Sequence, residues 1–259
     1  MFFLSGTTSA EWWLLNNLME KLGSFLFKFR NLIFPLFFFL LVFSTRPFLG
    51  TEQLEYWTYV IGIAVALAGQ FIRALTIGLA YIVRGGRDRK VYAKKLVKEG
   101  IFAHSRNPLY LGNIMIVIGL GIIANSIPFY FIGIPLFVFM YLAITRAEEK
   151  YLRDKFGAEY IEYCKNVNRF IPDLSGISAT IKSMTFNWQR LVVKEYGTTY
   201  SWIICVVLLI MKNQYFRNSG RISETAILTS SISFILATIF YAAARYLKKS
   251  GRWSGKLQK

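Results

Sequence analysis

The sequence is poor in the residues that carry metal or nucleophilic chemistry. Its 259 residues include two cysteines, Cys164 and Cys205, and a single histidine, His104. These are too few for the usual four-ligand zinc site. A Ser-His-Asp or Cys-His nucleophile would have to use His104, and no matching signature surrounds it, which argues against a hydrolase. Neither a GxGxxG nor a GxxxxGK[ST] phosphate-binding stretch occurs.

Acidic residues are also scarce, whereas apolar residues are abundant. The chain has 14 Asp and Glu against 31 Lys and Arg, a formal net charge of +17. Hydrophobic residues make up 54% of it and aromatic residues 17%, with a mean hydropathy of +0.40. This is too apolar for an ordinary soluble domain of this length, so we expect an integral membrane protein.

Long stretches almost free of charge predict an all-α fold, a polytopic membrane bundle of about six transmembrane helices. An interfacial helix is expected over residues 1–30. The third and fourth spans are joined by a tight turn at Asn125–Pro128 and should form a helical hairpin. The fifth is short, and its start is expected as early as Val192. The predicted spans are 26–44, 56–83, 109–125, 127–145, 199–211 and 226–246.

The basic residues are unevenly distributed along the chain. They concentrate in the loop 84–107, in the region 146–194 and in the tail after the sixth span, and are nearly absent between spans one and two and between spans three and four. The positive-inside tendency then places both termini in the cytoplasm, in a bacterial inner membrane or the endoplasmic reticulum. Basic loops beside a membrane usually bind anionic lipid headgroups, so we expect these as partners and no nucleic acid.

A first polar cluster, GIFAHSRNPLYLGN, precedes the third span. Gly100 is expected to end a helix over 91–99, and Pro108 to lie in the first turn of the third span. The free amides at that helix start, beside Arg106 and Asn107, suit an anion such as a carboxylate or a phosphate. The alternative is a lipid-facing anchor.

A second polar cluster follows the fourth span. A helix over 147–165 would carry an apolar stripe that includes Leu152 and Tyr160. Glu148 and Glu149 stand where the span ends, and an antiparallel hairpin returns them to the level of Arg106. An arginine, a helix start and two carboxylates at one depth can bind both ends of a zwitterion. The alternative is an Arg106–Glu149 salt bridge that only staples the hairpin.

Together the two clusters resemble a known family. The stretch LVKEGIFAHSRNPLYLGN, a hairpin, and EEKYLRDKFGAEYIEYCKNVNRFIP are similar to the isoprenylcysteine carboxyl methyltransferase family and its phospholipid methyltransferase relatives, over about residues 62–172. The resemblance implies a membrane enzyme that transfers a methyl group from S-adenosylmethionine to a lipophilic or lipidated acceptor, with a catalytic segment at the cytoplasmic face. It divides the chain into a methyltransferase core, 31–172, and a C-terminal extension with two further spans, 173–259.

The resemblance also implies roles for single residues. Many members have histidine where this chain has Asn107, which favours binding over proton transfer at that position. Arg169 or Arg146 would position a carboxylate acceptor, whereas Glu148 would take the proton of an amine acceptor. The expected cofactor-binding residues are Gly100, His104, Arg106, Asn107, Pro108, Tyr110, Leu111, Gly112, Glu149, Tyr160 and Tyr163.

Further expectations stay open from the sequence. Arg73 is a charge inside the second span, and such residues face a cavity or a partner, so we expect it in the pocket. The extension could contribute to the acceptor opening, mediate oligomerisation or simply anchor the chain. Two other functions remain: a reductase with a nicotinamide cofactor, related to the sterol reductases, and a non-catalytic transporter or scaffold.

Overall fold

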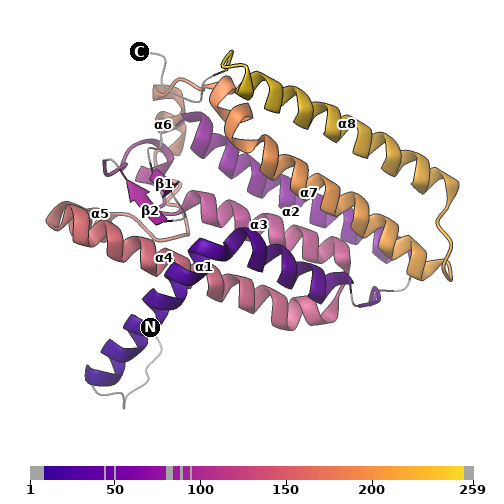
Figure 1. Ribbon diagram of the computed structural model, residues 1–259, viewed down its shortest axis with the longest axis horizontal. Coiled ribbons are helices and arrows are strands. Elements are labelled where there is room, and N and C mark those ends of the chain that lie inside the picture. The colour runs from indigo at the N-terminus through magenta and orange to yellow at the C-terminus, as the bar shows by residue number, and fades with distance from the viewer. Residues whose placement is uncertain are drawn as a thin grey trace.

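The computed structural model is a bundle of long helices that run side by side, with a small ribbon and short helices gathered at one end (Figure 1). It describes residues 9–43, 45–49, 51–79, 84–87, 90–93 and 95–253. Parts of the predicted interfacial helix, second span, basic loop and basic tail lie outside these residues. In chain order the elements are α1 (Ser9–Phe43), α2 (Glu52–Leu79), β1 (Arg84–Arg87), β2 (Lys90–Ala93), η1 (Gly100–Ala103), α3 (Pro108–Ala124), η2 (Phe129–Gly133), α4 (Ile134–Phe156), α5 (Ala158–Asn166), α6 (Ile177–Ser183), α7 (Trp188–Arg217) and α8 (Glu224–Lys249).

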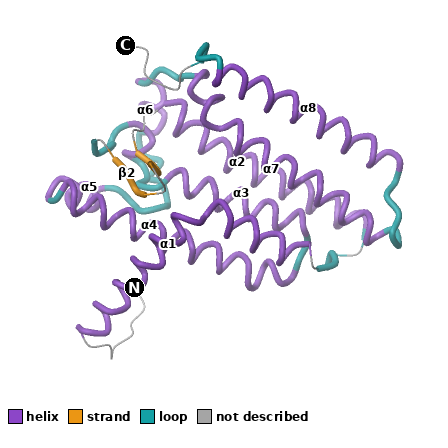
Figure 2. The backbone as a smooth tube through the Cα atoms, viewed as in Figure 1, coloured by secondary structure: helices purple, strands orange, loops and turns teal. Residues whose placement is uncertain are grey.

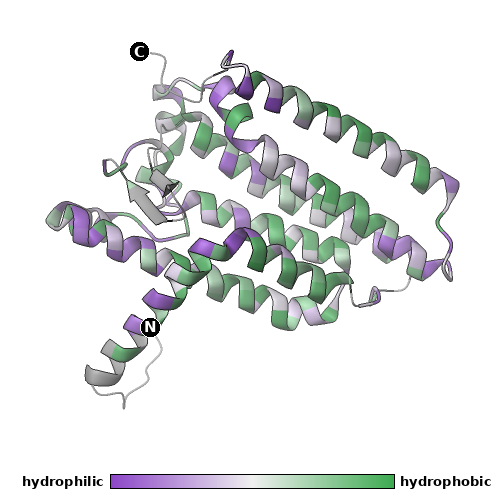
Figure 3. Cartoon of the chain, viewed as in Figure 1, coloured by the Kyte–Doolittle hydropathy of each residue, from purple (hydrophilic) through white to green (hydrophobic). Residues whose placement is uncertain are grey.

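The predicted helical membrane bundle is confirmed. Among the described residues, five helical stretches are long and apolar enough to cross a membrane: 16–43, 52–79, 129–156, 188–217 and 224–249. The remaining predicted span, 109–125, corresponds to α3, whose 17 residues extend about 25 Å at 1.5 Å per residue. Hydrophobic residues line the lengths of the helices, whereas hydrophilic residues concentrate toward their ends (Figure 3).

The hairpin forms where the sequence predicts it. Helix α3 begins at Pro108 and ends at Ala124, and Asn125 follows in the left-handed conformation with φ of 52°, which asparagine tolerates better than most residues. A π-helical turn, η2, then leads into α4. The first residues of α3 and the last turns of α4 therefore lie at the same end of the bundle as the ribbon (Figure 2).

Three local predictions differ from the structure. The interfacial helix and the first span are one continuous helix, α1. The helix expected over 91–99 is wrong, because β2 pairs antiparallel with β1 and Gly100 opens η1 with φ of 64°. The helix expected over 147–165 is interrupted at Gly157, whose φ of 51° ends α4, because a positive φ breaks helical geometry and glycine reaches it at little cost.

Helices α2 and α3 pack closely because glycines face each other across their contact. A Cβ on Gly69 would lie 2.6 Å from the carbonyl oxygen of Gly112, and a Cβ on Gly62 would lie 2.6 Å from that of Gly119. Small residues at such positions let two membrane helices approach backbone to backbone. The close contact brings Arg73, one turn beyond Gly69, against the first turns of α3.

Helix α7 is fixed to the bundle at the end opposite the ribbon. The Lys212 ammonium donates to the carbonyl oxygens of Val42 at 2.9 Å and Ala124 at 3.3 Å. These carbonyls belong to the last turns of α1 and α3, which a cation stabilises because helix C-termini carry partial negative charge. Arg217 pairs with buried Glu55 at 2.7 Å. The C-terminal extension is thus packed into the core through α7.

Candidate functional site

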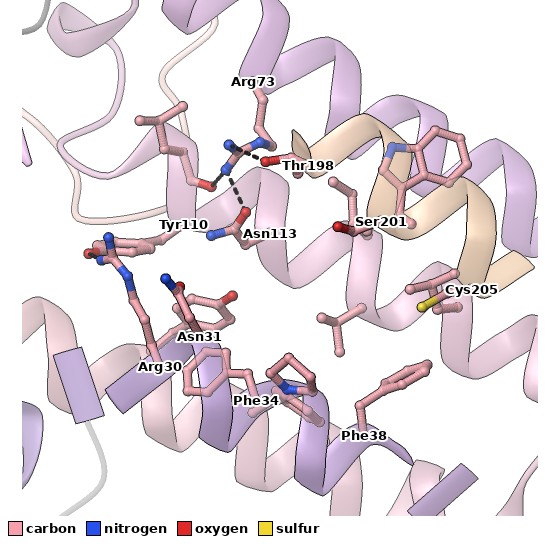
Figure 4. Close-up of a pocket in the computed structure, with 18 of the residues that line it drawn as sticks. Arg30, Asn31, Phe34, Phe38, Arg73, Tyr110, Asn113, Thr198, Ser201 and Cys205 are labelled. Carbon is pink, nitrogen blue, oxygen red and sulfur yellow. Dashed lines mark hydrogen bonds between the residues drawn. The ribbon is translucent and has the colours of Figure 1, made fainter. Parts of the chain in front are cut away.

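A cavity of about 810 Å³ opens among α1, α3, α4 and α7, a volume typical of small-molecule sites. Figure 4 shows α1 on one side, with Arg30, Phe34 and Phe38, facing Thr198, Ser201 and Cys205 of α7 across it. The lining residues are Arg30, Asn31, Phe34, Pro35, Phe38, Phe39, Arg73, Phe102, Arg106, Asn107, Pro108, Leu109, Tyr110, Asn113, Ile116, Val117, Leu120, Phe137, Tyr141, Glu148, Thr198, Tyr200, Ser201, Trp202, Ile204, Cys205 and Leu208.

The cavity wall changes from polar to apolar along the helices. On α3 the lining begins with Pro108 and Tyr110 and continues through Val117 to Leu120. The polar end lies next to the ribbon end of the bundle, where α3 begins and α4 ends. A ligand with one polar end and one apolar end fits such a wall.

Buried Glu149 holds two arginines beside the polar end. Its exposed fraction is 4%. Arg169 donates to both of its carboxylate oxygens, at 3.0 and 2.7 Å, and Arg106 Nη1 lies 3.2 Å from Oε1. The prediction that the hairpin brings the two clusters together is confirmed. The alternative, in which the Arg106–Glu149 salt bridge only holds the two ends of the hairpin together, predicts the same contact.

Arg106 retains hydrogen-bonding capacity. Its Nη1 also donates to Cys164 Sγ at 2.6 Å, but its buried Nε has no hydrogen-bond partner among the described residues. Burial is the largest single effect and lowers the pKa of Arg106, but the interactions with Glu149, Cys164 and Tyr160 together outweigh it, so that the pKa is raised. Arg106 is therefore a firmly charged group whose buried Nε makes no hydrogen bond among the described residues.

Glu148 is the second buried carboxylate, and it lines the cavity itself. Its Oε1 accepts a hydrogen bond from the Tyr110 hydroxyl at 2.7 Å. That hydroxyl also accepts a long contact of 3.5 Å from Nη1 of Arg30 on α1. The polar end therefore combines a carboxylate, a phenol and two cationic side chains within one space.

Asn107 lines the cavity, whereas His104 lies behind its wall. His104 Nδ1 donates to the carbonyl oxygen of Asp173 at 2.7 Å, and Nε2 contacts the Thr180 hydroxyl at 2.9 Å. Asn107 Nδ2 donates to the carbonyl oxygen of Arg169 at 3.1 Å. His104 is buried and does not line the cavity. Its contacts hold the segment that carries Arg169 against the start of α3.

The other predicted site residues fall into two groups. Pro108 lines the cavity. Gly100, Leu111, Gly112, Tyr160, Tyr163 and Arg146 do not. Tyr160 and Tyr163 are buried against Leu152 and Ala93, and the Tyr163 hydroxyl donates to the carbonyl oxygen of Phe102 at 2.6 Å. Arg146 Nη1 donates to Asn16 Oδ1 at 3.0 Å, on α1.

Arg73 lines the cavity, as the sequence predicts, and its partner is one that the sequence does not indicate. Its Nε and Nη2 donate to the two carboxylate oxygens of Glu195 on α7, at 2.8 and 2.7 Å. Its Nη1 donates to Asn113 Oδ1 at 2.5 Å. The signal that could have found Glu195 is its own charge, because it lies near the start of the fifth span when that span begins at Val192.

These features define a polytopic helical membrane protein with an amphiphilic cavity at one end of its bundle. Residues 57–159 match the family model of the phospholipid methyltransferases. The resemblance to the isoprenylcysteine and phospholipid methyltransferase family is confirmed over this segment, which carries both Arg106 and the Glu148–Glu149 pair. Helices α1 and α7, which line the cavity from two sides, lie outside it.

Curated proteins show the same relationship over part of the chain. The protein-S-isoprenylcysteine O-methyltransferase of Saccharomyces cerevisiae is 33% identical over 122 residues, which cover 44% of this chain and 48% of that protein. The cobalt-zinc-cadmium resistance protein CzcN of Cupriavidus metallidurans is 30% identical over 116 residues, 45% of this chain and 48% of that protein. The chain therefore spans about half the length of these relatives. No solved structure matches it.

One relative is named for resistance to metals, which makes the metal-ligating side chains of interest. In the part of the chain that the structure describes, no group of three or more His, Cys, Asp or Glu side chains gathers where an ion could be held.

Proposed function

We propose that the chain is an S-adenosylmethionine-dependent methyltransferase that acts on a lipophilic acceptor at the membrane. The observation that carries this proposal is the amphiphilic cavity, whose polar end is built by Arg106 and Glu148 of the segment that matches the methyltransferase family. The names of the relatives from Saccharomyces cerevisiae and Arabidopsis thaliana, both protein-S-isoprenylcysteine O-methyltransferases, support the same class of reaction.

The residues at the polar end fit the amino-acid portion of the methyl donor. Arg106 Nε is a buried donor without a partner among the described residues, and a carboxylate is its natural acceptor. Glu148 supplies a negative charge on the cavity wall for an ammonium or sulfonium. When bound, S-adenosylmethionine would supply an activated methyl group on a positively charged sulfur.

The chain's own residues would contribute alignment and the exclusion of water. Glu149 holds Arg106 and Arg169 in fixed orientations, and a positioned arginine orients a carboxylate more precisely than a mobile one. The apolar lining keeps the cavity dry and strengthens the charge interactions at its polar end. A carboxylate acceptor needs no base, whereas Glu148 would accept the proton of an amine acceptor.

Binding of labelled S-adenosylmethionine to detergent-purified protein tests the proposal. We expect Arg106→Ala and Glu149→Gln to abolish measurable binding while circular dichroism stays that of the parent protein. Arg146→Ala is the matched control, because it removes a charge at the same end of the bundle from a side chain that does not line the cavity. Normal binding by both site variants would mean that the Arg106–Glu149 pair only staples the hairpin.

The unmodified protein distinguishes the other functions in the same assay. Binding of NADPH without S-adenosylmethionine or S-adenosylhomocysteine would point to a reductase, and binding of neither would point to a scaffold or transporter. Incubation with labelled cofactor, total membrane lipids and a prenylcysteine analogue then identifies the acceptor by the product that carries the label.

We also propose that the polar end of the cavity faces the cytoplasm. The last residues of α8 and the described ribbon β1–β2 between α2 and α3 lie at that end of the bundle (Figure 1). Both regions are basic in the sequence, as the positive-inside tendency requires.

A further inference from the structure

We propose that Arg30 on α1 binds the anionic headgroup of an amphiphilic acceptor in the cavity. This inference rests on the proposed function and deepens it, because it names the chemistry of the acceptor and a residue that recognises it. Arg30 lies outside the segment that matches the family model.

Three arginines line the cavity, and their charges are balanced differently. Arg73 makes a two-point ion pair with Glu195, and Arg106 pairs with Glu149. Arg30 has no ion pair with a carboxylate of the described residues. Its contacts are the 3.5 Å hydrogen bond to the Tyr110 hydroxyl and a position 4.4 Å over the Phe27 ring.

A half-buried guanidinium beside an apolar cavity favours an anion in that cavity. Its five donors match the oxygens of a carboxylate or phosphate in pairs, and Tyr110 and Phe27 leave most of these donors available. The Tyr110 hydroxyl adjoins Glu148, so that an anion held by Arg30 lies beside the polar end where the methyl donor is proposed to bind.

The wall beyond Arg30 fits the chain of the same ligand. Arg30, Phe34 and Phe38 follow at four-residue spacing and line the cavity together from one face of α1 (Figure 4). Phe38 is eight positions after Arg30, a rise of about 12 Å at 1.5 Å per residue. An extended backbone advances about 3.5 Å for every three bonds, so this distance accommodates an extended chain of about ten bonds.

The opposite wall follows the same order. On α7 the lining residues begin with Thr198 and Ser201 and continue to Cys205 and Leu208. The headgroup of the ligand would therefore contact polar side chains of both α1 and α7, and its chain would contact less polar ones of both helices. A membrane carries such anionic amphiphiles both as prenylated cysteine carboxylates and as phospholipids, and they share the charge that Arg30 would recognise.

Quenching of Trp202 fluorescence measures occupancy of the cavity directly. Trp202 lines the cavity, and its indole nitrogen donates to Gln70 at 3.1 Å. The probes are dodecyl phosphate, dodecanoate and dodecanol with brominated chains, added to protein in phosphatidylcholine nanodiscs without methyl donor. Subtracting the signal of Trp202→Phe removes quenching of the other tryptophans.

We expect both anionic probes to bind more tightly than dodecanol. Arg30→Gln should weaken the anionic probes by about tenfold or more, since hydrogen bonds to charged groups are worth this much, and should leave dodecanol unchanged. Arg30→Lys should recover part of the loss. Lys28→Gln is the matched control, because Lys28 is exposed on the same helix and does not line the cavity, and it should bind like the parent.

An equal loss of anionic-probe affinity in Arg30→Gln and Lys28→Gln would overturn the assignment, because the effect would then come from surface charge. No loss of affinity in either variant would overturn it as well. Tighter binding of dodecanoate than of the phosphate would indicate a carboxylate acceptor, and the reverse a phospholipid. The assay contains no methyl donor. Amphiphile binding without donor binding would therefore refute the proposed function alone, whereas donor binding without a preference for anions would refute this inference alone.

Discussion

The Arg73–Glu195 ion pair joins the family segment to the extension, and its removal has a calculable cost. The side chains are 11% and 4% exposed and meet through two hydrogen bonds of 2.8 and 2.7 Å. Replacing Glu195 with leucine leaves a buried guanidinium without its countercharge, which costs about 3–5 kcal/mol in the free energy of unfolding. Replacing Arg73 with methionine leaves a buried carboxylate and costs a similar amount, reduced by the Gln70 amide that still donates to Glu195 at 3.2 Å.

The double variant separates the pair from its parts. Arg73→Met with Glu195→Leu removes both charges together, and exchanging a buried pair for apolar residues is often neutral. We therefore expect it to cost less than either single variant. Unfolding in mixed micelles with increasing dodecyl sulfate, followed by circular dichroism, gives the free energies for a double-mutant cycle.

A surface pair provides the control for this cycle. Lys98 and Glu159 lie 2.7 Å apart with side chains 45% and 51% exposed, and exposed pairs contribute about 0–1 kcal/mol. Lys98→Gln should leave the unfolding curve almost unchanged. If the single variants at Arg73 and Glu195 cost no more than this, or if the double variant costs their sum, the pair is not the buried contact described above.

Three further predictions concern the helix packing around the site and the residues of its polar end. Gly112→Ala should destabilise the protein by about 1–3 kcal/mol, because a Cβ there would lie 2.7 Å from a backbone carbonyl oxygen of α2. Gly197→Ala is the control, because a Cβ there would meet nothing within 4 Å. It should be neutral or stabilising in the same unfolding assay. Tyr110→Phe removes the hydroxyl that donates to Glu148 and should weaken methyl-donor binding about tenfold by calorimetry, as expected for a hydrogen bond to a charged group; unchanged affinity would exclude a binding role for that contact. Asn107→His should change donor affinity by less than about threefold if the position only donates a hydrogen bond, and a large gain in turnover would instead indicate proton transfer there.

Sequence reasoning located the hairpin and the meeting of its two ends. The distance between Arg106 and Glu149 follows from local signals: Pro108 fixes the start of α3, the Asn125–Pro128 turn reverses the chain, and helix length returns Glu149 to the same depth. Each step depends on backbone rules that a short stretch of sequence carries. The pairing beside the polar end of the cavity could therefore be predicted from the sequence.

The remaining walls of the cavity depend on packing between segments far apart in the chain. The sequence around Arg30 does not indicate a contact with Tyr110, 80 residues away. An arginine at a membrane boundary usually extends toward lipid headgroups. Glu195 was likewise missed because the start of α7 is less apolar than its middle. His104 differs in another way: its position in the motif predicts a pocket residue, but it does not line the cavity, and its ring nitrogens contact Asp173 and Thr180.

The cavity combines walls from inside and outside the segment that matches the family model. The groups proposed to handle the methyl donor lie within the family segment, residues 57–159, whereas the walls proposed to receive the acceptor come largely from α1 and α7 on either side of it. The proposed donor and acceptor contacts thus come from different stretches of the chain. On the proposed function, chimeras that graft α1 and α7 from a relative should therefore carry the acceptor preference of that relative with them.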